Sequence, residues 1–331
     1  MRNGNTSPVF VVGCPRSGTT LLHHMILSAG DFALARFESD TFSLLAPRFA
    51  DLASLKARKR LMDFWLASEN FVQSGLNRDD IEPEVLRGCR DAGDFLRIVM
   101  ETLCRKQNVH RWAEKTPDHA LYIPQIKQSF PEALIVHIIR DGRDAALSLA
   151  KFGRIRPFFW TRGSGLVSFG LFWQWMVRRG RSDGQKIGQD YYELRYEDLV
   201  EKPQETLARL GDFIHHDLDY DRIRQVGIGS VTQPDSSFKS GSPAEKFAPV
   251  GRWKKHYTPE ELARFEALVG EGLEEMGYPL ATRPRRTARA LSAVLTSAFY
   301  ELQLESKHWL KSHTPAGRLV GTRTYRGVAE V

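Results

Sequence analysis

The sequence contains few cysteines and no pattern typical of a metal site. Its three cysteines, Cys14, Cys89 and Cys104, form no CxxC pair and leave an odd count. This argues against a disulfide scaffold and predicts a reducing, cytoplasmic compartment. His23 and His24 are adjacent but have no partner at ligand spacing, so we expect no metal site.

Long hydrophobic runs are also missing. The first ten residues, MRNGNTSPVF, contain no extended apolar core, so no signal peptide is predicted. The aromatic-rich stretch 158–177 is interrupted by Arg162 and by several glycines. It is therefore not predicted to span a membrane.

The excess of basic residues is confined to one end of the chain. The net charge is +7, but residues 283–331 hold nine basic and three acidic residues, which leaves +1 for residues 1–282. We therefore expect no nucleic-acid partner for the main domain, 1–282, and a basic helical extension over 283–331. An amphipathic helix in 287–311 would contact a membrane surface, the main domain or a second subunit, and we favour the last two.

The most informative stretch begins with an apolar run. Residues 9–12, VFVV, predict a buried strand; GCPRSGTT follows, and LLHHMIL then predicts a helix. A strand, a glycine-bounded loop and a helix form a phosphate cradle. Thr19 stands where a P-loop has lysine, and Arg16 supplies the positive charge instead.

Strand and helix patterns alternate along the rest of the chain. Short strands are predicted at 32–38, 133–139 and 191–196, and helices fill the region 41–110. One helix is expected over 55–76. This order predicts a three-layer α/β/α fold with a central parallel sheet, a P-loop-like nucleotide-binding fold in which 41–110 is a helical insertion that covers the substrate.

Three separated segments carry groups suited to phosphates. They are GCPRSGTT at 13–20, RDGRDAALS at 140–148 and GRWKK at 251–255. Two anion sites and a basic flap suit a ligand with phosphates at both ends. The candidate binding residues are Arg16, Ser17, Gly18, Thr19, Thr20, Arg140, Ser148, Arg252, Trp253 and Lys254.

These motifs, in this order, resemble those of the sulfotransferase family, over roughly residues 8–280. The resemblance implies the co-substrate 3'-phosphoadenosine 5'-phosphosulfate (PAPS), without a metal. PRSGTT is similar to the 5'-phosphosulfate loop and IIRDGRDAALS to the 3'-phosphate motif. The YEDL segment places Tyr196 near the adenine, and GRWKK resembles the loop that closes over the nucleotide. An acceptor hydroxyl or amine would attack sulfur in line.

The resemblance also implies catalytic residues. Arg16 and Lys115, in AEKTP, would stabilise charge on the transferred group. Cytosolic members have a histidine two residues after this lysine, where this chain has Pro117. The protein-tyrosine and related bacterial branches instead place a glutamate after the second strand, which favours Glu38 as the base over His119.

Two other functions fit parts of the sequence. A P-loop kinase is disfavoured by Thr19 and by the lack of a magnesium-binding strand motif. A non-catalytic membrane-surface protein would depend on the basic extension alone. The sequence does not identify the acceptor.

Overall fold

The computed structural model describes residues 6–152, 165–226, 249–282 and 291–314. Its centre is a four-stranded sheet, β1 (Val9–Val12), β2 (Ala113–Lys115), β3 (Leu134–Ile139) and β4 (Tyr191–Arg195). The strand order is β2-β1-β3-β4, and every neighbouring pair is parallel. The carboxyl ends of all four strands therefore lie along one edge, where open α/β sheets bind their ligands.

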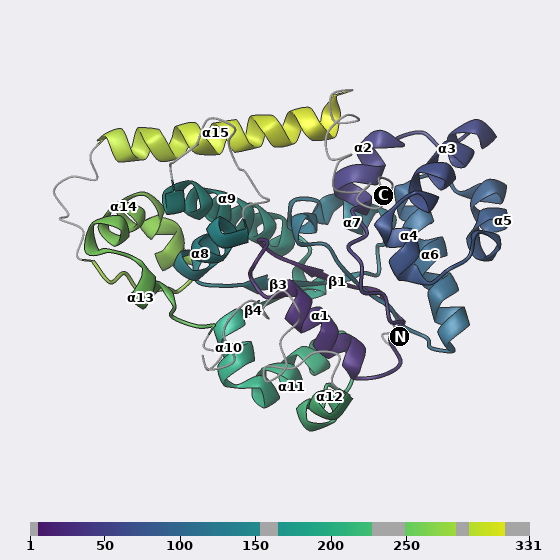
Figure 1. Cartoon of the computed structure of the whole chain (residues 1–331), viewed down its shortest axis with the longest axis horizontal. Helices are drawn as coiled ribbons and strands as arrows, with labels where there is room; N and C mark the ends of the chain where they lie inside the picture. The colour runs from purple at the N-terminus through teal and green to yellow at the C-terminus, as the bar shows by residue number, and fades with distance from the viewer. Residues whose placement is uncertain (1–5, 153–164, 227–248, 283–290, 315–331) are drawn as a thin grey trace.

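Both faces of the sheet are buried. Side chains of β1 alternate between two cores, with Phe10 and Val12 in one and Val9 and Val11 in the other. The first core also holds side chains of α7 (Ile123–Ser129), α8 (Gly142–Phe152), α9 (Gly165–Gln185) and α14 (Pro259–Glu275). The second holds side chains of α1 (Thr19–Ser28), α10 (Tyr196–Glu201), α11 (Pro203–Ile214) and α12 (Tyr220–Val226). Figure 1 shows helices on either side of the sheet, which confirms the predicted three-layer fold with its central parallel sheet.

A separate group of helices lies beside the sheet (Figure 1). It comprises the π-helical η1 (Thr41–Leu45), α2 (Ala46–Arg48), α3 (Leu55–Leu66), α4 (Glu69–Ser74), α5 (Arg78–Gly88) and α6 (Ala92–Gln107). The remaining elements are η2 (Pro117–Leu121), η3 (Gly188–Asp190), α13 (Trp253–His256) and α15 (Leu291–His313). None of the helices in the described ranges is both long enough and apolar enough to cross a bilayer. The proposed boundary between 282 and 283 falls at the edge of those ranges.

Three local predictions were wrong. Residues 32–38 form no strand, only a single bridge from Phe32 to Arg111. The helix expected over 55–76 is broken into α3 and α4, because the Ser68 hydroxyl accepts from the Phe71 amide and starts a new helix. Strand β2 was missed, since two of its three residues are the charged Glu114 and Lys115.

Candidate active site

The loop between β1 and α1 has an unusual backbone. Arg16 and Gly18 both have positive φ, at 71° and 96°. Such a conformation is costly for a non-glycine residue and is concentrated at functional sites. At Gly18 a Cβ atom would lie 2.3 Å from the Tyr196 ring, so only glycine fits under this side chain.

The N-terminus of α1 is open to an anion. Gly18 caps the helix without a side-chain hydrogen bond, and the first turn contains no acidic residue. The first amides of the helix, which have no partner within the helix, and the helix dipole favour negative charge here. Thr19 is buried in this turn, and Thr20 is half-buried beside it.

Arg140, at the carboxyl end of β3, ties this loop to two other segments. Its Nη1 donates to the Arg16 carbonyl at 2.9 Å and its Nη2 to the Pro249 carbonyl at 2.6 Å. Its guanidinium also lies 4.6 Å from the centroid of the Tyr196 ring. Arg16 Nε in turn donates to Ser148 Oγ at 3.2 Å. Four of the predicted nucleotide-binding residues thus meet in one cluster.

The segment at 249–256 is fastened to α8 by Asp144. The two oxygens of this carboxylate accept from the backbone amides of Gly251 (2.7 Å) and Trp253 (2.8 Å). Arg143 places its guanidinium 3.8 Å from the centroid of the Trp253 ring. Asp141 and Asp144 both lie near the start of α8 but have different roles. Asp141 accepts from the Arg143 amide near the start of α8, whereas Asp144 holds a loop more than 100 residues away.

The GRWKK residues differ in how closely they approach the cluster. Arg252 is half-buried, and its positive charge opposes the rise that burial causes in the pKa of Tyr196. Lys254 is exposed, with Nζ 5.7 Å from the centroid of the Trp253 ring. Arg252 is therefore the better placed of the two cations.

Several buried polar atoms of the cluster lack a hydrogen-bond partner among the described residues. They are Ser17 Oγ, Arg140 Nε and Tyr196 Oη. Burying such groups without a partner costs about 1–3 kcal/mol each. Together with the open amides of α1, they fit a ligand that carries phosphate groups.

The two predicted catalytic residues Glu38 and Lys115 form an ion pair. Lys115 Nζ lies 2.6 Å from Glu38 Oε1. The lysine is buried at the carboxyl end of β2, while 46% of the Glu38 side chain is exposed. The carboxylate is thus accessible, whereas the cation is fixed by the sheet.

His119 has a different environment. It is fully buried, and its Nε2 accepts from the Phe42 amide at 3.3 Å. Its Nδ1 lies 3.0 Å from Glu114 Oε2. Burial alone would raise the pKa of Glu114, but the electrostatic interaction with His119, followed by hydrogen bonds from His119, Thr116 and Ser39, lowers it to about 2. Both ring nitrogens are engaged within the protein.

Asp40 follows Glu38 by two residues in the chain. It was not predicted from the sequence to belong to the site. Its φ is 50°, and its backbone amide donates to Thr116 Oγ1 at 3.3 Å. Burial, followed by the negative charges of Glu38 and Asp118, raises the pKa of Asp40 to about 7. Glu38, Asp40 and Asp118 are therefore close enough to influence one another electrostatically.

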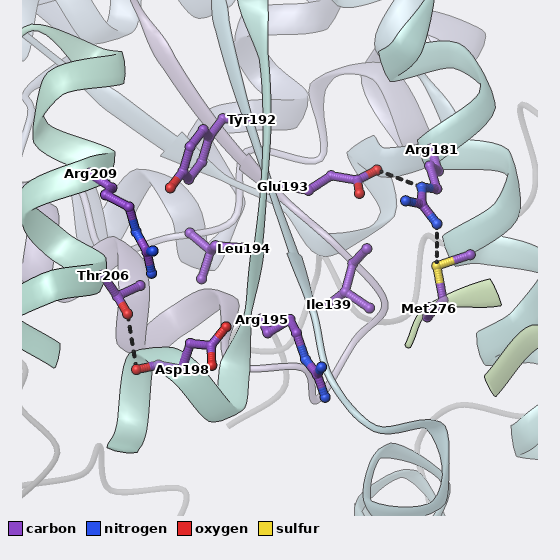
Figure 2. A pocket seen from close by; sticks show the side chains of 10 residues that line it. All are labelled: Ile139, Arg181, Tyr192, Glu193, Leu194, Arg195, Asp198, Thr206, Arg209 and Met276. Carbon is purple, nitrogen blue, oxygen red and sulfur yellow. Dashed lines mark hydrogen bonds and ion pairs between the residues drawn. The ribbon is translucent and has the colours of Figure 1, made fainter. Parts of the chain in front are cut away.

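Two cavities are present among the described residues. One, of about 680 Å³, is bordered by Phe42 and Tyr122, near Asp40 and His119 in the chain, and by the end of α15. The other, of about 410 Å³, follows the edge strand β4 and includes the Arg181–Glu193 ion pair (Figure 2). None of the predicted site residues lines either cavity. Within the same ranges, no group of three or more His, Cys, Asp or Glu side chains is arranged to hold a metal ion.

Comparison with known proteins identifies the family. The model of the sulfotransferase family matches residues 8–221, and the chain belongs to this family, a group of transferases. The sulfotransferase domain of the Synechococcus PCC 7002 olefin synthase superposes with a TM-score of 0.55 at 19% identity, covering 85% of this chain and 98% of that domain. The sulfotransferase domain of the curacin biosynthetic pathway gives 0.52 at 14% identity, covering 83% and 98%. These similarities confirm the fold.

The matches to curated relatives cover a smaller part of each chain. A putative protein-tyrosine sulfotransferase of Caenorhabditis briggsae is 25% identical over 64% of this chain and 66% of its own length. The omega-hydroxy-beta-dihydromenaquinone-9 sulfotransferase Stf3 of Mycobacterium bovis is 29% identical over 62% and 63%. An uncharacterized Aquifex aeolicus protein is 24% identical over 76% of this chain but only 31% of its own length. The matches thus span 31% to 66% of the length of these relatives.

Proposed function

We propose that this protein transfers a sulfuryl group from PAPS to an acceptor hydroxyl or amine. The observation that carries the proposal is the convergence of three distant segments on one cluster of buried, unpartnered polar atoms. The 13–20 loop, Arg140 with Ser148, and the 249–256 loop supply cations and amides to a single region. This arrangement suits a nucleotide with phosphates at its 3' and 5' positions.

On this proposal the donor is held mainly by backbone amides and arginines. The 13–20 loop and the first turn of α1, with Thr19 and Thr20, bind the 5'-phosphosulfate end. Arg140, Ser148 and Arg252 bind the 3'-phosphate, and Tyr196 packs against the adenine. When bound, PAPS supplies an activated sulfuryl group together with a nucleotide leaving group.

Glu38 and Lys115 are proposed to act on the acceptor. Glu38 takes the proton from the acceptor hydroxyl or amine as the new bond to sulfur forms, while the bond from sulfur to the 5'-phosphate oxygen of the donor breaks and the nucleotide leaves. Protonation neutralises the carboxylate of the ion pair, so the buried ammonium of Lys115 then faces the transferred group as an uncompensated charge. A fixed cation of this kind stabilises the negative charge that develops on the sulfuryl oxygens.

His119 is proposed to support the structure instead. Its Nε2 would have to give up the Phe42 amide before it could accept a proton, and the ring is fully buried. A base must lie within hydrogen-bond reach of the proton it removes. The half-exposed carboxylate of Glu38 meets this requirement better.

The acceptor class stays open in this proposal. The relatives' names point to a menaquinone derivative in one case and to protein tyrosine in the other. The cavity of about 680 Å³ and the helices of 41–107 are proposed to shape the acceptor pocket.

The proposal is tested by incubating the full chain with PAPS labelled in the sulfuryl group. Pools of alcohols, phenols, amines, carbohydrates and lipids serve as acceptors, in buffer with a chelator. Transfer of label to one pool is the expected result. Turnover of ATP with magnesium, combined with no response to PAPS, would indicate a kinase and refute the proposal.

A further inference from the structure

Helix α15 presents an apolar face to the outside of the molecule. Leu295, Phe299, Leu302 and Trp309 are each 56–66% exposed, and Leu310 is 49% exposed. Their spacing places them on one face of the helix. In Figure 1 this helix runs along the outer side of the helical layer. Large exposed apolar stripes of this kind mark interaction surfaces.

The opposite face of the same helix is packed against the domain. Leu304 is buried, and the His308 ring lies 5.1 Å from the Tyr122 ring and 6.0 Å from the Trp175 ring, centroid to centroid. Trp175 Nε1 donates to Glu305 at 2.7 Å. The predicted packing of this extension on the main domain is thus observed. It does not account for the outer apolar stripe.

The apolar stripe is uncharged, whereas the sequences before and after the helix are positively charged. The stripe itself contains no charged side chain, since the positions between its apolar residues on this face hold Ser306 and His313. In the sequence, residues 283–290 before the helix carry four arginines and no acidic residue. Residues 315–331 after it carry three arginines and one glutamate. An apolar helical face is thus flanked by positively charged sequence on both sides.

We propose that the outer face of α15 docks on an anionic lipid surface. Its apolar side chains would enter the headgroup region, and the arginine-rich flanks would add electrostatic attraction to acidic lipids. A second copy of the chain would also cover the apolar stripe. It would bring a second set of the same positively charged sequences, which repel one another and add no attraction. The charge pattern therefore favours lipid over self-association.

Docking would also place the larger cavity near the lipid. Ser312, His313 and Thr314, at the end of α15, line the cavity of about 680 Å³. Trp309 and Leu310 lie in the turn just before them, on or near the docking face. The rim of the cavity would therefore lie close to the headgroups.

The test is co-sedimentation of the full chain with vesicles of phosphatidylcholine, with and without phosphatidylglycerol. We expect binding only to the anionic vesicles, weakening as salt is raised. The double variant Leu302→Ser/Trp309→Ser should reduce this binding about tenfold or more, because it removes two apolar side chains that docking would bury in the lipid. The matched control is Leu55→Ser/Val72→Ser, which changes two side chains of similar exposure on α3 and α4 and should bind like the unmodified chain.

Melting curves establish that both double variants are folded, and the assay needs no enzymatic turnover. Failure of the unmodified chain to sediment with anionic vesicles overturns the proposal. So does equal binding by the folded Leu302→Ser/Trp309→Ser variant. Sedimentation velocity without lipid gives a third outcome: a dimer that this variant abolishes would show that a second copy covers the stripe, and the proposal would be wrong.

Discussion

The proposed donor side of the candidate active site, around Arg140 and Asp144, and the proposed acceptor side, around Glu38 and Lys115, are held together differently. On the donor side, Arg140 and Asp144 bind backbone groups of loops more than 100 residues away, so each loop fixes the next. On the proposed acceptor side, the ion pair of Glu38 and Lys115, with one partner half-exposed, lies beside hydrogen bonds from the Ser39, Asp40 and Phe42 amides to side chains of residues 114–119. The proposed donor side is thus held by two buried charged side chains that bind backbone groups, whereas the proposed acceptor side includes a half-exposed carboxylate.

This difference has a functional consequence. Binding a constant co-substrate favours a rigid cradle, since preorganised donors lose little freedom on binding. Proton transfer needs an accessible group whose charge can change during the reaction. Changes on the donor side should therefore affect nucleotide affinity, and changes on the acceptor side should affect turnover.

The largest effect is expected from Glu38→Gln. Loss of the base should lower turnover by about 10²- to 10⁴-fold and leave the affinity for 3'-phosphoadenosine 5'-phosphate (PAP) nearly unchanged. Initial rates and calorimetry measure the two quantities. Glu84→Gln is the matched control, because Glu84 is also ion-paired, at 3.1 Å, and is 45% exposed. Unchanged turnover in Glu38→Gln would assign the proton transfer to another group.

Arg140→Ala should have the opposite effect, a loss of nucleotide affinity. It removes the hydrogen bonds to Arg16 and Pro249 and a cation proposed to bind the 3'-phosphate. PAP affinity should fall by about 2–3 kcal/mol, or roughly 10²-fold. Arg58→Ala is the control. Like Arg140, Arg58 donates to backbone carbonyls, in its case three, but it lies on α3. Equal losses in both variants would mean that Arg140 only stabilises the fold.

A smaller effect is expected from Asp144→Asn. The amide retains one acceptor oxygen for Gly251 or Trp253, so the 249–256 loop loosens and PAP affinity should fall about tenfold. If Asp144 acts through this loop, its effect should largely disappear when Arg252 is already replaced by alanine. Asp183→Asn is the control, because Asp183 is also buried but is paired with the side chains of Arg179 and Lys186. Full additivity with Arg252→Ala would contradict this positioning role.

The smallest effect concerns stability and pH on the acceptor side. Because the folded state raises the pKa of Asp40 to about 7, ionising it opposes folding as the pH rises from about 4 through about 7. Asp40→Asn removes this cost and tolerates the positive φ. The melting temperature of Asp40→Asn minus that of the unmodified protein should therefore increase from about pH 5 to about pH 8. Asp63→Asn controls for the lost charge, and a difference independent of pH would refute the assignment.

The sequence predicted the donor side better than the acceptor side. Strands β1 and β3 and the loops after them are short local patterns, apolar runs followed by glycine or arginine, and these patterns survive in the fold. Strand β2 has no such pattern, because two of its three residues are the charged Glu114 and Lys115. The break at Ser68 and the role of Asp144 depend on one capping bond and one tertiary contact, which periodicity does not encode.

The acceptor side also shows why candidate residues need a structure. Glu38 and His119 were rivals by position in the chain alone. The structure places one beside Lys115 and half-exposed, and the other in a buried network with Glu114. That distinction comes from contacts 77 and 5 residues apart, neither of which a motif specifies.

The most direct test of the central claim compares the affinities of the unmodified chain for PAP and for adenosine 5'-phosphate, by calorimetry in the presence of a chelator. The two ligands differ only in the 3'-phosphate, for which Arg140, Ser148 and Arg252 are the proposed partners. The account predicts that PAP binds about 10²-fold more tightly or better. Equal affinity for the two nucleotides, or no binding of either, would contradict it.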